Sequence, residues 1–176
     1  MGKLYLIPNG KNGQAWGMDL MVAVTIFTFA LLSFYLYSLN TPAGIEETIE
    51  SLSYDGRGIT NNLLSEGSPE NWDENNVLEI GILRDGKIND TKLENFYNWV
   101  NSPGGYDETK RVFNTNFDYY FFLDENMTIN SVEIDGVGKP GVTRDNAMNN
   151  AANLIKISRV TVYQNKPMGA KLYIWG

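Results

Sequence analysis

The sequence predicts an α+β fold, in which the outer half of a long N-terminal helix packs on a C-terminal antiparallel sheet of about four or five strands. Three observations predict this fold. Residues 20–39 are apolar and uncharged, residues 45–64 place apolar side chains at helical spacing, and short runs of alternating polarity follow between turn residues. We expect a transmembrane helix over 14–40, an amphipathic helical extension over 41–66 and an α+β head over 67–176.

The composition of the chain argues against several classes of function. The 176 residues carry a net charge of −7 and the basic residues form no cluster, which argues against nucleic acid as a partner. The chain contains no Cys, which excludes disulfides, and no His, which removes the commonest general base and metal ligand. We therefore predict no enzymatic activity, no cofactor and no metal site.

The segment from Leu20 to Leu39 has the length and composition of a membrane-spanning helix. It contains no charged residue and spans roughly 30 Å as a helix, which is the hydrocarbon thickness of a bilayer. Trp16 precedes it, and Tyr35 and Tyr37 lie near its end, where aromatic side chains suit the membrane interfaces. The lipid bilayer is therefore the first predicted partner.

Charged residues on either side of this helix predict its orientation. Lys3 and Lys11 precede it, acidic residues follow it, and the next basic residue is Arg57. Basic residues favour the cytoplasmic side of a membrane. We therefore expect a single-pass protein of the cell membrane, with a cytoplasmic N-terminus and an extracytoplasmic C-terminal domain that can reach a surface filament.

Two other interpretations of the apolar segment remain open. A soluble protein can bury an apolar helix, although such helices rarely stay uncharged over this length. The segment can also belong to a secretory signal peptide that is cut after Ala43. Its apolar run exceeds the roughly 7–15 residues typical of such peptides, and Pro42 lies inside that cleavage site.

The residues before the helix carry a more specific pattern. The segment 1–13 (MGKLYLIPNGKNG) is short and basic and ends in Gly13, and Gln14 begins the stretch that leads into the helix. It resembles the class III (prepilin) signal peptide of type IV pilins and archaeal pilin-like proteins. The resemblance implies that 1–13 is a leader, that a prepilin-type peptidase cuts between Gly13 and Gln14, and that the helix stays in the mature protein.

The same resemblance gives a carboxylate a role in assembly. In that family an acidic residue is usual at the fifth mature position, where it pairs with the free α-amine of a neighbouring subunit; here Met18 is fifth and Asp19 sixth. A charge at the edge of an apolar core is costly unless it is paired. Asp19 is therefore the expected assembly contact. The alternative is that Asp19 lies among lipid headgroups without a specific partner.

The head is predicted to contain alternating strands and short helices. Strands are expected at 77–83, 117–123, 128–134, 157–163 and 169–175, and helices at 91–100, 107–113 and 147–154. The last two strands form a predicted hairpin around 165–167, and Asp90 is the expected cap of the helix at 91–100. We expect Trp72, Trp99 and the aromatic run 119–122 in the core.

A second resemblance extends into the head. The stretch 63–72 (LLSEGSPENW) is similar to the leucine-rich, then Gly-x-Pro-x-Asn-Trp segment of uncharacterised archaeal pilin-like membrane proteins. Ile80-Gly81-Ile82 and Lys92-Leu93 follow at similar distances. The resemblance implies a pilin-like arrangement, a long helix followed by a C-terminal sheet.

The remaining chemical motifs in the head have ordinary structural explanations. The adjacent carboxylates of Asp73-Glu74 and Asp124-Glu125 diverge in direction, so solvated turns are expected. Residues 85–90 lack the spacing and distal Glu of a calcium loop, and the glycine-rich segment 136–141 lacks the order of a phosphate loop, so we expect a mobile loop there. Asn89 and Asn126 begin glycosylation sequons, and both are candidate modification sites.

Together these features predict a pilin-like structural subunit of a cell-surface filament or a related secretion or adhesion assembly. The subunit is expected in the membrane before assembly, with self-association or association with other pilin-like subunits afterwards. The alternative is a single-pass, membrane-anchored extracytoplasmic binding or accessory module that does not polymerise.

Overall fold

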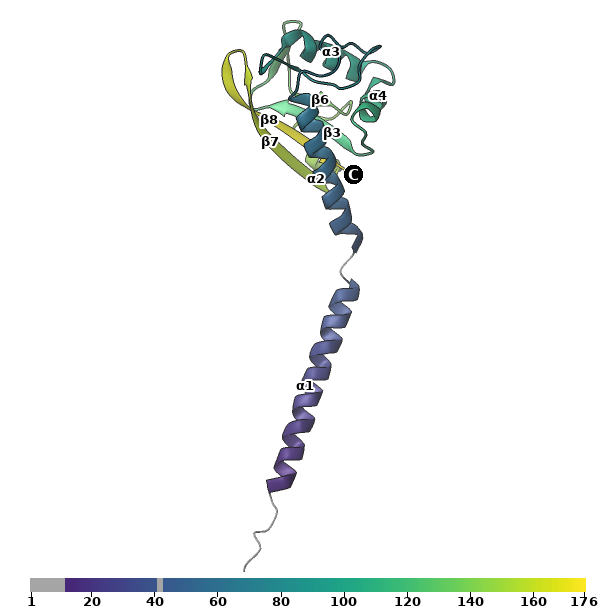
Figure 1. The fold of residues 1–176 in the computed structure, drawn as a ribbon, viewed down its shortest axis with the longest axis vertical. Helices are drawn as coiled ribbons and strands as arrows, with labels where there is room; N and C mark the ends of the chain where they lie inside the picture. The colour runs from purple at the N-terminus through teal and green to yellow at the C-terminus, as the bar shows by residue number, and fades with distance from the viewer. Residues whose placement is uncertain (1–11, 41–42) are drawn as a thin grey trace, which may run out of the picture. The chain divides into compact units, whose positions relative to one another are not determined.

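The computed structural model describes residues 12–40 and 43–176 of the chain (Figure 1). Most of the predicted leader, residues 1–11, and the expected helix bend at Pro42 lie outside the described residues. The chain divides into two compact units, Met1–Gly44 and Ile45–Gly176. The α+β prediction is confirmed, because the first unit contains an apolar helix and the second combines helices with antiparallel sheets.

The first unit contains helix α1, Asn12–Asn40. Within α1, the 23 residues of Gly17–Leu39 form a helix long and apolar enough to cross a membrane. All of these residues are exposed, so no part of the described chain covers them. Two hydroxyl groups are satisfied within the helix, because Thr25 and Thr28 donate to the carbonyl oxygens of Met21 and Val24, both at 2.8 Å.

Helix α2, Ala43–Leu63, is the predicted amphipathic extension. Leu52, Ile59 and Leu63 are buried in the core of the second unit, as their helical spacing indicates. Gly56 does not interrupt the helix but lets it approach the sheet, because a Cβ there would lie 2.5 Å from Ile157 Cδ1. Small size at this position therefore serves packing.

A four-stranded antiparallel sheet forms the centre of the head, with the strand order β6-β3-β8-β7. The strands are β3 (Asp118–Leu123), β6 (Val137–Gly138), β7 (Leu154–Tyr163) and β8 (Lys166–Trp175). β3 and β8 pair over their whole common length, with Tyr120 opposite Tyr173. Figure 1 shows α2 crossing in front of these strands, and the approach of Gly56 to Ile157 agrees with that arrangement.

Both faces of the central strands are buried. On one face Tyr119, Phe121 and Leu123 of β3 and Leu172 and Ile174 of β8 join the core that contains α2. On the other face a second cluster gathers under the segment that carries the 3₁₀ helix η1, Ala147–Asn150; its buried members are Tyr120, Phe122, Ala147, Tyr173 and Trp175. The sheet is therefore the middle layer of the head, and the expected aromatic core is confirmed.

Two helices and two small hairpins complete the head. The helices are α3 (Asp90–Asn101) and α4 (Gly105–Val112), close to their predicted positions. Asn89, not Asp90, caps α3, because its side chain accepts a hydrogen bond from Lys92 N at 3.1 Å. The hairpins pair β1 (Leu83–Arg84) with β2 (Lys87–Ile88), and β4 (Met127–Ile129) with β5 (Val132–Ile134).

Four predicted elements in the head are wrong or incomplete. Residues 77–82 form no regular strand, because their backbone bonds to the turn after α2 instead of to a sheet. The strand expected at 128–134 is the β4–β5 hairpin, and the helix expected at 147–154 shortens to η1 before β7 begins. The glycine-rich segment expected as a mobile loop contains β6, which pairs with β3.

The predicted final hairpin is confirmed and is longer than expected. β7 and β8 pair over ten positions each, from Leu154 opposite Trp175 to Tyr163 opposite Lys166. The turn consists of Gln164 and Asn165, both with positive φ (48° and 61°), one position before the predicted turn. Positive φ at both central residues is typical of the two-residue turns that match the twist of paired strands.

Candidate functional site

The predicted assembly residues lie on α1. Gly13 and Gln14 lie in its first turn, and Asp19, Leu20 and Leu39 are exposed along it. Among the residues that the structure describes, no salt bridge involves Asp19. The carboxylate therefore remains available to a partner from outside the described chain.

The stretch 63–72 forms a compact turn against residues 79–83, and we call this contact the α2 lock. Gly67 has a φ of +72°, and a Cβ there would lie 2.7 Å from both Glu79 O and Gly81 N, so only glycine fits without strain. Trp72 is buried and donates from Nε1 to Gly81 O at 2.7 Å. Two segments separated along the chain are thus held at backbone contact.

Backbone bonds and a buried lysine fasten the α2 lock to the end of the helix. Ile82 N donates to Leu63 O at 2.9 Å, and Leu83 N donates to Ser65 O at 2.8 Å. Lys92 is 5% exposed, and its amine donates to Glu66 O at 2.6 Å and to Leu83 O at 3.0 Å. Ile82 N therefore satisfies a carbonyl group that α2 leaves unpaired at its C-terminus, and the other donors fix the turn that follows the helix.

The motif residues of the second resemblance therefore meet in one structural unit. The glycines and Trp72 of the α2 lock close it, Ile80 and Ile82 bury their side chains beneath it, and Lys92 donates hydrogen bonds into it. Each of these contacts fixes the end of α2 on the head. The lock is a scaffold for α2.

A second polar centre surrounds Asp118 at the start of β3. Its carboxylate lies 2.5 Å from Lys139 Nζ and 3.4 Å from Lys110 Nζ, and the Tyr106 hydroxyl donates to it at 3.0 Å. Burial alone would raise the pKa of Asp118. The hydrogen bonds from Lys139 and Tyr106 and the charge of Lys110 outweigh burial and hold that pKa below its usual value.

The tyrosines beside this centre are held neutral. Burial raises the pKa of Tyr106 and of Tyr119 well above the usual value for a phenol. The Tyr119 hydroxyl lies 2.6 Å from Thr109 Oγ1, and the Tyr106 hydroxyl accepts from Tyr119 N at 3.1 Å. These groups form a closed network that ties α4 to β3.

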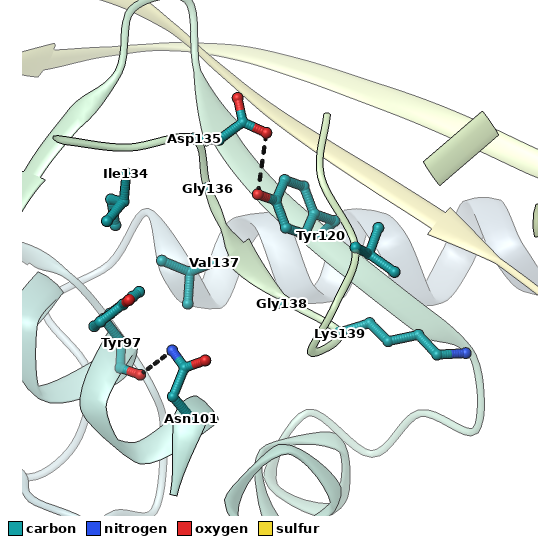
Figure 2. A pocket seen from close by; sticks show the side chains of 10 residues that line it. Tyr97, Asn101, Tyr120, Ile134, Asp135, Gly136, Val137, Gly138 and Lys139 are labelled. Atoms are coloured by element: carbon teal, nitrogen blue, oxygen red, sulfur yellow. Dashed lines mark hydrogen bonds between the residues drawn. The ribbon is translucent and has the colours of Figure 1, made fainter. Parts of the chain in front are cut away.

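A hollow of about 230 Å³ lies between α3 and the segment that carries β6 (Figure 2). Figure 2 shows the hydrogen bonds from Tyr120 to Asp135 and from Asn101 to the carbonyl of Tyr97. Their donor–acceptor distances are 3.2 Å and 2.8 Å. Asp135 also accepts from Arg144 N at 2.6 Å. The polar groups of this hollow are therefore largely bonded inside the protein, and the bonds to Asp135 help to hold the glycine-rich segment in place.

The two sequons differ in accessibility. The side-chain oxygen of Asn89 accepts the capping bond of α3, and the residue is half-buried. Asn126 is exposed in the turn between β3 and β4. Attachment of a sugar needs a free side-chain amide, so the geometry favours Asn126 over Asn89.

The acidic motifs lie in turns. Asp73 and Glu74 are exposed, as predicted, and Asp85 and Gly86 form the turn between β1 and β2. Asp124 is more than a solvated turn residue: it accepts from Gly169 N at 2.9 Å and pairs with Lys171. These two partners lower the pKa of the Asp124 carboxyl.

Several of these groups gave no signal in the sequence. The sequence pattern around Lys92 is that of an ordinary surface lysine on a helix. Asp118 and Lys139 are 21 residues apart along the chain, so no local pattern pairs them. Only the resemblance at 63–72, 80–82 and 92–93 pointed to the residues of the α2 lock, and it gave no role for them. No protein-family model, curated protein or solved structure matches this chain.

Proposed function

We propose that this protein is a pilin-like structural subunit, anchored in the cell membrane by α1 before it enters a surface filament or a related secretion or adhesion assembly. The observation that carries the proposal is the surface of α1. Its 23-residue segment Gly17–Leu39 is apolar on all sides and exposed throughout. Such a helix needs lipid or other helices around it, and the described chain supplies neither.

The proposal gives both environments of α1 a physical basis. In the membrane, lipid covers the helix, and in an assembly the helices of neighbouring subunits replace lipid by lateral packing. Val24, Thr25, Thr28, Phe29 and Leu32 lie together on one exposed side of α1, where a neighbouring helix can pack. In the proposed assembly Asp19 pairs with the α-amine of the adjacent subunit.

The orientation and the leader belong to the same proposal. Lys3 and Lys11 keep the N-terminus in the cytoplasm, which leaves the head outside. A prepilin-type peptidase then removes residues 1–13, and the new α-amine of Gln14 becomes available for the contact with Asp19. The sequon at Asn126 is on the side where sugars are attached.

N-terminal sequencing of the protein from native membranes tests the processing step. A start at Gln14 supports the proposal, a start at Met1 supports a plain anchor, and a start at Gly44 means a secreted domain without α1. Gly13→Val is expected to block cleavage. Gly17→Ala is the matched control, because a Cβ at Gly17 meets no atom within 4 Å, and it is expected to leave processing intact.

The assembly step has its own test. Electron microscopy of cell surfaces with and without the gene is expected to show loss of filaments, and Asp19→Asn is expected to leave membrane insertion unchanged while depleting the subunit from sheared filaments. The competing function is an anchored binding or accessory module that does not polymerise. A processed, membrane-bound protein that never enters a sheared or cross-linked assembly supports that competing function.

A further inference from the structure

One side of α2 faces away from the rest of the head, and we call it the outer stripe of α2. Five exposed residues at helical spacing make it up: Glu50, Tyr54, Arg57, Gly58 and Asn61. The buried residues Leu52, Ile59 and Leu63 lie on the opposite side of the helix, against the core. The outer stripe is therefore the part of α2 that the head leaves uncovered.

Tyr54 distinguishes the outer stripe from an ordinary solvated helix surface. It is 79% exposed, and it is the only exposed aromatic residue among the described residues of 45–176. The other aromatic side chains described in the head are buried or half-buried. Tyrosine is enriched at the centre of protein interfaces, because its ring buries a large area and has few rotatable bonds to fix. An aromatic ring held in water on a helix points to a protein partner.

Gly58 lies one turn beyond Tyr54 and has no packing role within the described chain. A Cβ there would meet no atom within 4 Å, whereas a Cβ at Gly56 would lie 2.5 Å from Ile157 Cδ1. Glycine inside an exposed helix destabilises that helix relative to alanine. The head itself gains nothing from this glycine, but a neighbouring molecule can approach the bare backbone closely at this point.

The charges of the outer stripe discriminate between ways of packing two copies of α2. Glu50 and Arg57 are separated by about 10 Å along the helix axis. Two parallel copies without an axial shift would place like charges opposite one another. A shift of about 6–10 Å, one to two turns, instead brings Glu50 of one copy towards Arg57 of the next. The same shift brings Tyr54 of the first copy onto Gly58 of the second.

The sequence places the outer stripe directly after the helix that is proposed to assemble. Only Thr41 and Pro42 separate α1 from α2. Subunits whose α1 helices pack side by side in one membrane therefore bring the beginnings of their α2 helices close together. All copies enter the membrane in the same orientation, so neighbouring α2 helices are expected to be parallel. A second copy of this chain is thus the partner that connectivity and charge both favour.

We propose that the outer stripe of α2 binds the outer stripe of a second copy, in parallel and shifted by one to two turns. Tyr54 of one subunit packs on the backbone at Gly58 of the next, and Glu50 of the first pairs with Arg57 of the second. Each subunit presents different ends of its stripe to two neighbours, which is a head-to-tail contact that can repeat along a fibre. The contact rests on the proposed function, because lateral packing of α1 brings the stripes together.

Disulfide cross-linking tests the contact directly, because the chain contains no Cys. The full chain with Tyr54→Cys/Gly58→Cys is expected to give a ladder of trimers and larger species when native membranes are oxidised. A bond within one subunit is not expected, since side chains four apart on a helix have Cβ atoms about 5–6 Å apart and a disulfide needs about 3.5–4.5 Å. The matched control is Tyr54→Cys/Asn98→Cys, whose second substitution is at an exposed position of α3. This control is expected to give no ladder.

Further substitutions test the register and the role of the glycine. Glu50→Arg or Arg57→Glu, added to the cross-linking variant, is expected to weaken the ladder about threefold, as for a partly exposed ion pair, and both together are expected to restore it. In the otherwise wild-type chain, Gly58→Leu is expected to keep or raise the melting temperature of the head, because leucine is the better helix former. It is also expected to deplete the subunit from sheared assemblies, whereas Asn98→Leu is expected to leave incorporation unchanged.

Phe29→Cys on α1 separates this contact from the proposed function. Phe29 is 65% exposed, and a flexible thiol-reactive cross-linker there reports lateral packing of α1 whatever the α2 helices do. Cross-linking at Phe29 without a ladder from Tyr54→Cys/Gly58→Cys would overturn the contact and leave the proposed function standing. A ladder that stops at dimers, or one that the control matches, would also overturn the contact. The absence of cross-linking at both places would overturn the proposed function together with the contact.

Discussion

Helices α1 and α2 follow one another in the chain but differ in every feature that decides where a helix can reside. α1 is apolar around its whole circumference and exposed from Gly17 to Leu39. α2 is apolar on one side only, and that side is buried in the head. Their glycines show the same contrast: a Cβ at Gly17 meets no atom within 4 Å, whereas a Cβ at Gly56 would lie 2.5 Å from Ile157 Cδ1.

The contrast shows that the pattern of a helix predicts its partner. A one-sided apolar stripe, as on α2, needs one surface to cover it, and the sheet supplies that surface. An all-round apolar surface, as on α1, needs a surrounding solvent of lipid or a bundle of like helices. Substitutions in the two helices should therefore affect different measurements.

The largest effect is expected from a charge on the buried side of α2. Ile59 is 0% exposed, and Ile59→Asp places an unpaired carboxylate in the core. We expect a loss of more than about 4 kcal/mol in the free energy of unfolding, measured by circular dichroism in micelles. Tyr54→Asp on the exposed side of α2 is the control, with an expected change within about 0.5 kcal/mol. Equal losses in both variants would mean that α2 does not pack as described.

The same substitution in α1 is expected to act on the membrane instead. Ile26 is 64% exposed. We expect Ile26→Asp to make the free energy of inserting α1 into a membrane less favourable by about 2.5–3.5 kcal/mol. The measurement is the fraction of protein that alkaline carbonate releases from membranes, with Ile26→Leu as the control. The melting temperature of the head is expected to stay unchanged. Full retention of Ile26→Asp in the membrane pellet would count against the membrane role of α1.

A smaller loss is expected when the α2 lock is opened. Lys92→Met removes the amine that donates to Glu66 O and Leu83 O and leaves two carbonyl groups unpaired. We expect a loss of about 1–3 kcal/mol in the free energy of unfolding. Lys87→Met is the control, because Lys87 donates to Asn165 at an exposed position. If both variants unfold alike, Lys92 does not stabilise the end of α2.

The head should respond to pH through Asp118, whereas the uncharged segment 20–39 of α1 should not. A carboxyl whose pKa is lowered by folding stabilises the protein above its unfolded pKa of about 3.9, and that contribution is lost as pH falls through the folded pKa. At pH 6 we expect the free energy of unfolding of Asp118→Asn to be about 1 kcal/mol lower than that of the wild-type protein. The loss is no larger because the partner Lys139 is 42% exposed and its charge is partly screened.

As pH falls below the unfolded pKa of about 3.9, the difference between wild-type and Asp118→Asn is expected to shrink. Thermal melts at pH 6 and pH 2.5 measure it. The comparison with the variant removes the contribution of Asp124, whose pKa is also lowered and which is unchanged in both proteins. A difference that persists undiminished at pH 2.5 would show that the charge of Asp118 is not the source.

The smallest effect on stability is expected at the exposed sequon of Asn126, whose glycosylation reports on which side of the membrane the head lies. Asn126→Gln is expected to remove one glycan from the intact mass of the native protein and to change stability by less than about 0.5 kcal/mol. Asn89→Gln is expected to do the opposite. This variant is expected to keep the same glycan mass as the wild-type protein. Its free energy of unfolding is expected to fall by about 1 kcal/mol, because the capping hydrogen bond of α3 is lost. Native protein with both asparagines bare would remove the glycosylation prediction.

The sequence predicted the parts of the fold that depend on local periodicity. α1, α2, α3 and the β7–β8 hairpin each follow from the spacing of apolar residues within one segment. The segment 77–82 was mistaken for a strand because Ile80 and Ile82 are buried against the α2 lock, which is a contact across the chain. The turn at Asn130-Ser131 was missed because it has positive φ at both residues without a glycine.

The candidate site was less predictable than the fold. Asn89 and Asn126 were found by their sequons, but only the structure separates a capping side chain from an exposed one. The hollows beside Trp72 and Trp99 lie between the turn at 71–75 and a face of α3, and no local pattern pairs those segments. The role of Gly13, Gln14 and Asp19 stays a prediction, because it concerns a peptidase and a neighbouring subunit.

The central strand β3 limits how this head can change over time. Five consecutive residues, Tyr119 to Leu123, are buried although their side chains point alternately to the two faces of the sheet. A charged or much smaller replacement at any of them disturbs one of two cores, so neutral drift is expected to spare this strand. Variation between related chains should instead collect at the turns and along β7, where it can alter what the head contacts without altering how it folds.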